Sequence, residues 1–127
     1  AGQRAAPRAR LEEPSGERLF EVIGCGDCHV PRILGLQGEA SAYTDLLLHR
    51  ITEDVPGVAD GYADPYQYRT PPLWGLSRTA PYLHDGSAET IADAIAAHDG
   101  EARASRERYE ALSETERAPL VRFLNNL

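Results

Sequence analysis

Apolar residues near the start of the chain follow the spacing of a short helix. We expect this helix from 16 to 23, because Leu19 and Ile23 lie four residues apart on one apolar edge. Ser15 directly precedes the helix and can cap its first turn. The helix then leads straight into the stretch GCGDCHVPR, residues 24–32.

The last third of the chain has the periodicity of three further helices. The first should begin at Ser87 or Thr90 and end by Gly100, with one face made of Ile91, Ala94, Ile95 and His98. A polar helix should follow over about 101–111.

A capping box predicts the start of the third of these helices, because Ser113 lies three residues before Glu116. Pro119 lies beyond the first turn, where we expect it to kink or strain the helix. The buried face of this last helix is expected to consist of Leu120, Val121, Phe123, Leu124 and Leu127.

The middle of the chain, 30–81, reads as loops. Prolines interrupt it at positions 31, 56, 65, 71, 72 and 81. The run YTDLLLHR, 43–50, fits a turn of helix or a short buried strand, and its spacing does not distinguish the two. So long a stretch without regular structure is unusual in a compact domain, unless a large apolar cofactor replaces part of the core.

Composition narrows the class of protein. The 127 residues are enough for one domain, and the 42% apolar and 26% charged fractions are those of an ordinary globular chain. The net charge of −7 and the dispersed arginines argue against binding to nucleic acid and favour encounter with a basic partner. No apolar run is long enough to span a membrane. The sequence opens without a secretion leader, so we expect a mature or trimmed chain.

The chemistry of the chain centres on its two cysteines, Cys25 and Cys28, with His29 directly after them. A redox or disulfide pair is one interpretation, but thioredoxin-like motifs follow a strand. Half of a zinc site is a second, but the chain offers no further cysteine. Covalent haem attachment is the third: each thiol adds to one vinyl group, and His29 becomes the proximal ligand of the iron.

The haem interpretation also accounts for the loops and indicates the compartment. We expect a mainly α, cytochrome c-like domain over 15–127, with short helices and long loops wrapped around one covalent haem c. An arm at 1–14 should precede it. Because bacterial haem attachment occurs outside the cytoplasmic membrane, we expect a periplasmic or otherwise exported protein.

A longer stretch carries a family resemblance. The segment YRTPPLWGLSRTAPYLHDGSAETIADAIAAHDGEA, 68–102, resembles the C-terminal haem domain of the bacterial di-haem cytochrome c peroxidase superfamily. The run AYTDLLLHR with RTPPLWGL is most similar to the branch of di-haem oxidoreductases. Members of this family carry two haem domains in one chain, whereas this chain has one attachment motif.

The resemblance implies a distal iron ligand at His98, fourteen residues after His84. The chain contains no methionine, so His/Met coordination is excluded. His98 also lies on the apolar face of an expected helix, where an imidazole needs a partner. His84 is the chief rival, although in the family this histidine hydrogen-bonds near the haem. His49 should make a surface or propionate hydrogen bond.

Other residues are expected near the haem. Trp74, Leu73 and Leu76 are candidates for its apolar wall, and Tyr68, Tyr82, Arg69 and Arg78 for contacts to its propionates. In the family, carbonyls equivalent to those of Thr79 and Pro81 help to bind calcium between two haem domains. Calcium is therefore a candidate second cofactor.

These features lead to a hypothesis of single-electron transfer by a bis-histidine, low-spin mono-haem cytochrome, serving an unidentified redox partner protein. With both axial positions filled, this chain should not itself be an enzyme. An alternative is a haem subunit or fragment of a peroxidase-like oxidoreductase, which passes electrons to a catalytic haem on another domain. Either hypothesis is compatible with a dimer or with a partner haem subunit. A haem module that tethers a larger oxidase is a third hypothesis.

Overall fold

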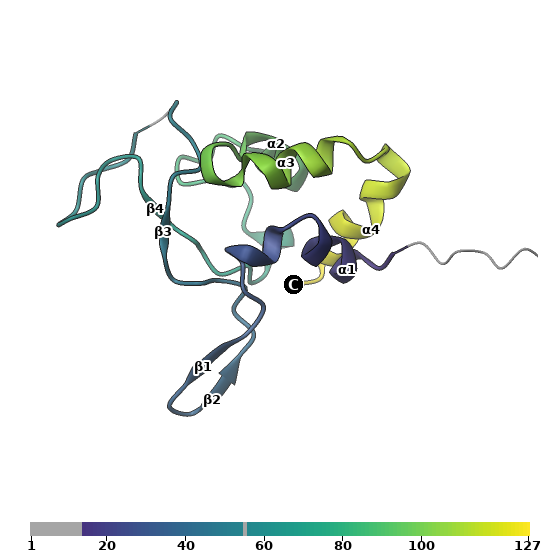
Figure 1. Cartoon of the computed structure of the whole chain (residues 1–127), viewed down its shortest axis with the longest axis horizontal. Helices are drawn as coiled ribbons and strands as arrows, with labels where there is room; N and C mark the ends of the chain where they lie inside the picture. Colours follow the sequence, from purple (N-terminus) through teal and green to yellow (C-terminus); the bar gives the residue numbers. More distant parts are fainter. Residues whose placement is uncertain (1–13, 55) are drawn as a thin grey trace, which may run out of the picture.

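Four α-helices frame the structure. The computed structural model describes residues 14–54 and 56–127, and Figure 1 shows the arrangement of their elements. The helices are α1 (Gly16–Val22), α2 (Ile91–Ala97), α3 (Arg103–Glu110) and α4 (Glu114–Asn125). Three single-turn 3₁₀ helices are η1 (Cys25–Asp27), η2 (Leu76–Arg78) and η3 (Gly100–Ala102).

Two small antiparallel sheets lie in the segment expected to be loops. Strand β1 (Ile33–Gly35) pairs with β2 (Gly38–Ala40) in a hairpin that projects from the body of the molecule (Figure 1). Strand β3 (Leu48–His49) pairs with β4 (Tyr68–Arg69), so that His49 faces Tyr68 across the ladder.

The expectation of a mainly α fold is therefore wrong, and the fold is α+β. The hairpin turns tightly at Gly38, whose φ of 117° suits glycine. The second sheet joins strands of two residues each from distant parts of the chain, which is too short for any periodicity to reveal. YTDLLLHR thus ends in a strand, and its three leucines are exposed rather than buried.

The main core lies between the first and the last helix. It is formed by Leu19, Phe20, Ile23, Ile91, Tyr109, Leu120 and Leu124. Gly16 lies so close to α4 that a Cβ there would be 2.1 Å from the carbonyl oxygen of Pro119. Phe20 makes edge-on contacts with Tyr43 and Phe123, each at 5.7 Å between ring centroids.

The helix predictions are confirmed in outline. Ser15 caps α1 by accepting a hydrogen bond from the Arg18 amide at 3.2 Å, and α2 begins after Thr90 rather than Ser87. Ser113 and Glu116 form the expected capping box. The polar helix is split into η3 and α3, and α4 continues through Pro119.

The expected N-terminal arm lies outside the described residues, apart from Pro14. None of the helices in the described ranges is both long and apolar enough to cross a membrane.

Candidate functional site

The cysteine motif forms a tight turn directly after α1. Cys25 begins η1, and the amide of His29 donates to the carbonyl oxygen of Cys25 at 2.9 Å. Gly24 has a φ of 95°, and a Cβ there would be 2.8 Å from the Ser105 hydroxyl on α3, so this position requires glycine. The two thiols are not joined in a disulfide.

Both thiols are protonated at neutral pH in this environment. Burial raises the pKa of Cys25 to about 11. Burial also raises the pKa of Cys28, and the negative charges of Asp45 and Glu101 act in the same direction. Neither thiol therefore has the lowered pKa of a catalytic redox cysteine, which disfavours the thioredoxin-like interpretation.

His29 is oriented by a backbone carbonyl. Its Nδ1 lies 2.9 Å from the Tyr43 oxygen, to which the ring N–H donates. The lone pair of the ring is then on Nε2, the nitrogen able to bind a metal. Burial lowers the pKa of His29, which favours the neutral form that a ligand requires.

His98 has the same arrangement on another part of the chain. It is the residue that ends α2, one position beyond the helix, with extended backbone angles. Its Nδ1 donates to the Ala94 oxygen at 2.6 Å, which again leaves the lone pair on Nε2. Burial lowers the pKa of His98 as well.

The structure brings these two histidines into electrostatic range. Besides burial, the charge of His98 lowers the pKa of His29. A histidine that binds a metal typically donates its other ring N–H to a carbonyl or carboxylate, which fixes the tautomer and the ring orientation. Both His29 and His98 meet this condition with backbone carbonyls.

His49 is held differently, with both ring nitrogens on carboxylates. Nε2 lies 2.6 Å from Asp45 and Nδ1 lies 3.1 Å from Glu101. These hydrogen bonds raise the pKa of His49, which favours the protonated ring. The expectation that His49 makes hydrogen bonds rather than ligating iron agrees with this geometry, although its partners are the protein's own carboxylates.

His84 is exposed and its ring stacks on Tyr68 at 4.2 Å between centroids. Arg69 lies in β4 and is exposed, as is Arg78 at the end of η2. The Tyr82 hydroxyl donates to the Leu76 oxygen at 2.5 Å. Propionate contacts were expected for Tyr68, Tyr82, Arg69 and Arg78, and these contacts stay predictions.

The expected apolar wall is divided between core and surface. Leu73 and Leu76 pack against the main core. Trp74 is 59% exposed, and its indole N–H donates to the Ser41 oxygen at 2.7 Å. Thr79 follows η2, two residues before Pro81, and calcium binding there stays a prediction.

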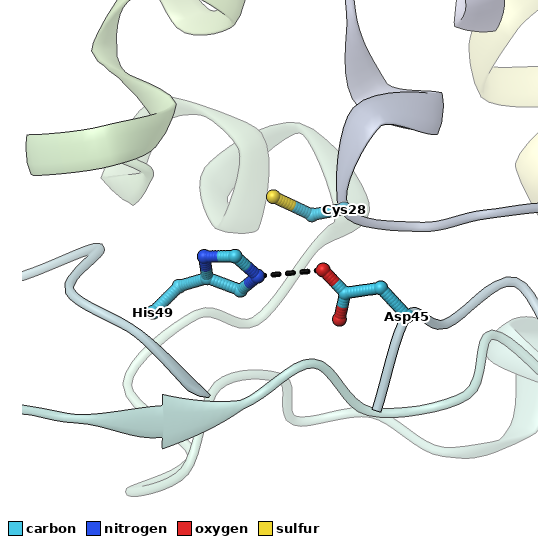
Figure 2. Close-up of side chains that lie close together, drawn as sticks. All are labelled: Cys28, Asp45 and His49. Atoms are coloured by element: carbon cyan, nitrogen blue, oxygen red, sulfur yellow. Dashed lines mark hydrogen bonds and ion pairs between the residues drawn. The ribbon is translucent and has the colours of Figure 1, made fainter. Parts of the chain in front are cut away.

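Asp45 and Glu101 are site residues that the sequence interpretation missed. Figure 2 shows the carboxylate of Asp45 facing the ring of His49, with the Cys28 sulfur beside this pair, and the possible metal-binding atoms of these three side chains lie within 4.8 Å of one another. The spacing of Asp45 and His49 in YTDLLLHR was a signal for this pair. Glu101 is 52 residues away from His49, and no local pattern could have indicated it.

The residues present fit a covalently bound haem. Two neutral thiols lie beside a neutral, oriented imidazole, and a second such imidazole is in electrostatic range. Large apolar side chains that suit contact with a porphyrin are exposed in the middle of the chain: Leu46, Leu47, Leu48 and Trp74. In the bound state Cys25 and Cys28 would carry the thioether links and His29 and His98 would hold the iron.

Comparison with models of protein families gives a match over almost the whole chain. A family model described as "Di-haem oxidoreductase, putative peroxidase" matches residues 2–127. Searches of the curated proteins and of the solved structures find no match.

Proposed function

The chain belongs to the di-haem oxidoreductase family, and from this premise of a haem-dependent redox role we propose that it is a mono-haem electron-transfer domain. In this proposal Cys25 and Cys28 bind one haem covalently, and His29 and His98 are its axial ligands. The observation that carries it is the matched orientation of the two histidines, each with Nδ1 on a backbone carbonyl.

A bound haem supplies a one-electron couple between ferric and ferrous iron. The protein's contribution is to hold both imidazoles neutral and fixed, so that little rearrangement accompanies a change of charge. Burial favours the neutral form of both rings by lowering their pKa values, and the backbone oxygens of Tyr43 and Ala94 fix the ring orientations. If His29 and His98 both held the iron, no coordination position would be left for peroxide. The site therefore favours electron transfer over peroxidase chemistry.

A second candidate follows from the family description, which names two haems, whereas this chain has one Cys-x-x-Cys-His motif. The domain would then pass electrons to a catalytic haem on a partner domain or subunit. We place the protein outside the cytoplasmic membrane in either case, since bacterial haem attachment takes place there.

The haem-loaded protein tests the proposal directly. We expect low-spin spectra in both oxidation states, unchanged by cyanide or carbon monoxide, and no turnover of peroxide by the isolated domain. Peroxide turnover by this domain alone would overturn the proposal. Turnover that appears only when a second haem protein is added would favour the second candidate.

A further inference from the structure

One segment of the chain contacts residues next to both candidate iron ligands, His29 and His98. This segment, 43–51, is here called the strap. At its first end, Tyr43 accepts the hydrogen bond from His29, and the Thr44 amide donates to the Val30 oxygen at 3.0 Å. Thr44 is fully buried, and its hydroxyl donates to the Thr70 oxygen at 2.6 Å. The first end of the strap is therefore fixed to the backbone around His29.

The other end of the strap is fixed to the loop that follows His98. The Asp99 amide donates to the Ile51 oxygen at 2.8 Å, and the Glu101 amide donates to the Arg50 oxygen at 2.9 Å. Gly100, between them, has a φ of 54°, and a Cβ there would be 2.4 Å from the Arg50 oxygen. The backbones of the strap and of this loop are therefore in direct contact, which leaves no room for a side chain at position 100.

His49 joins the two ends of this arrangement through its side chain. Nε2 contacts Asp45, at the beginning of the strap, and Nδ1 contacts Glu101, three residues after His98. The second oxygen of Glu101 accepts from the Arg50 amide at 2.5 Å. Only 17% of the His49 side chain and 10% of the Asp45 side chain are exposed, so the contact between these two is shielded from water and is stronger than one on an open surface. The Glu101 side chain is 52% exposed, so its contact with His49 is partly open to water.

We propose that His49 is a positioning residue that fixes the strap to the loop after His98 and thereby holds His98 at bonding distance from a haem bound by His29. This inference rests on the proposed function, because it assigns His98 as the distal ligand. His49 does not itself bind the iron, since both of its ring nitrogens are engaged.

Carbon monoxide is the probe for this role. It binds ferrous iron only when the distal ligand has dissociated, so its apparent affinity reports the fraction of molecules with an open site. In haem-loaded His49→Leu we expect this affinity to rise roughly tenfold, the size of effect given by losing hydrogen bonds to charged groups. His49→Gln should raise the carbon monoxide affinity less than His49→Leu does, because an amide can still donate to one carboxylate. Arg32→Gln, which removes an exposed ion pair in the hairpin, is the control and should match the wild type.

The combination with His98→Gly separates positioning from a general effect on structure. In that background His49 has no distal ligand to hold, so adding His49→Leu should leave carbon monoxide binding unchanged. An equal rise in both backgrounds would overturn the proposal. If His49→Leu does not fold, Glu101→Gln tests the same contact at unchanged volume and should shift the affinity in the same direction. No shift in Glu101→Gln would overturn the proposal.

Two further outcomes are distinguishable. If the wild-type protein binds carbon monoxide as readily as His98→Gly does, the proposed function fails and the positioning role fails with it. If the wild type is closed and His98→Gly is open, but His49→Leu stays closed, the positioning role alone fails. Titration of the haem-free protein with Zn²⁺ tests the competing interpretation of Cys28, Asp45 and His49 as a metal site, because the Cys28 thiol is free only when no haem is attached. Binding that disappears in His49→Leu would identify a metal site and overturn our proposal.

Discussion

The ring of Tyr43 lies edge-on to that of Phe20, with 5.7 Å between the two centroids. Phe20 is almost fully buried in the main core, while the backbone oxygen of Tyr43 accepts the hydrogen bond from His29. The residue that orients His29 is thus anchored in the packing between α1 and α4. In the proposed function, core stability and the geometry of the haem ligand are therefore connected through one tyrosine.

Substitution of His98 should change the iron's coordination without releasing the haem. His98→Met should keep a six-coordinate, low-spin iron and raise the reduction potential, because a thioether favours ferrous iron. We expect a shift on the order of 0.1 V, within the range of about 0.8 V that axial ligands cover. His98→Gly should instead bind carbon monoxide. Redox titration and absorption spectra measure both.

His84→Gly is the matched control for His98→Gly. His84 is exposed and stacks on Tyr68, so its replacement should leave the distal ligand in place. Loss of the low-spin spectrum in the His84 variant, together with an unchanged His98→Gly, would show that the two histidines have exchanged roles.

Single replacement of either cysteine should leave the haem attached. Cys25→Ala or Cys28→Ala removes one thioether link, and the other continues to hold the group. The double variant should lose it on denaturation. Mass spectrometry of the denatured chains measures this, with the mass of one haem retained in the single variants only. Retention in the double variant would contradict covalent attachment through these thiols.

Replacement of His49 should alter the pH dependence of stability. The Asp45 and Glu101 hydrogen bonds raise the pKa of His49, so its contribution is complete below its ordinary value of about 6.5 and is lost as pH rises through the folded value. At the acidic side Glu101 has a lowered pKa, caused first by the Arg50 amide and then by His49. The contribution of Glu101 to stability is complete above the ordinary pKa of a glutamate and is lost as pH falls through its pKa in the folded protein.

The free energy of unfolding of haem-loaded wild type and His49→Gln, measured by denaturant titration, tests this. The wild type should exceed His49→Gln in stability most near pH 5.5, below the ordinary histidine pKa of about 6.5. This difference in stability should shrink toward pH 9. A difference that stays constant over this range would mean that protonation of His49 does not contribute.

Gly16→Ala should destabilise the contact between α1 and α4. The new Cβ would meet the backbone oxygen of Pro119 and the Phe123 Cβ, at 2.1 and 2.5 Å in the present positions, so the helices must separate. Overpacking of this kind costs about 1–3 kcal/mol of unfolding free energy. Gly35→Ala is the control, because its nearest neighbour is the Gly38 oxygen at 3.7 Å, and it should change stability by less than about 0.5 kcal/mol.

The sequence predicted those parts of the molecule that short-range rules determine. The helix start at Thr90, the capping box at Ser113 and the apolar edge of α1 are local, and the structure has them. The pairing of β3 with β4 and the contact of His49 with Glu101 are not local, and neither was expected. Leu46, Leu47 and Leu48 show the same limit, since a run of leucines indicates an apolar contact but not whether protein or cofactor provides it.

The packing of α1 against α4 has a consequence for the order of folding and haem attachment in the proposed function. The cysteine motif and His98 both precede α4, so in a chain exported from its N-terminal end they cross the membrane before the helix that packs on α1. Contacts between residues so distant in sequence form late and slowly, because the intervening chain must first be brought together. A nascent chain can therefore present its thiols in an open, incompletely packed form, in which Cys25 is accessible to attachment enzymes before the burial that raises its pKa to about 11. Closure of the two terminal helices would then seal a haem that is already joined to the chain.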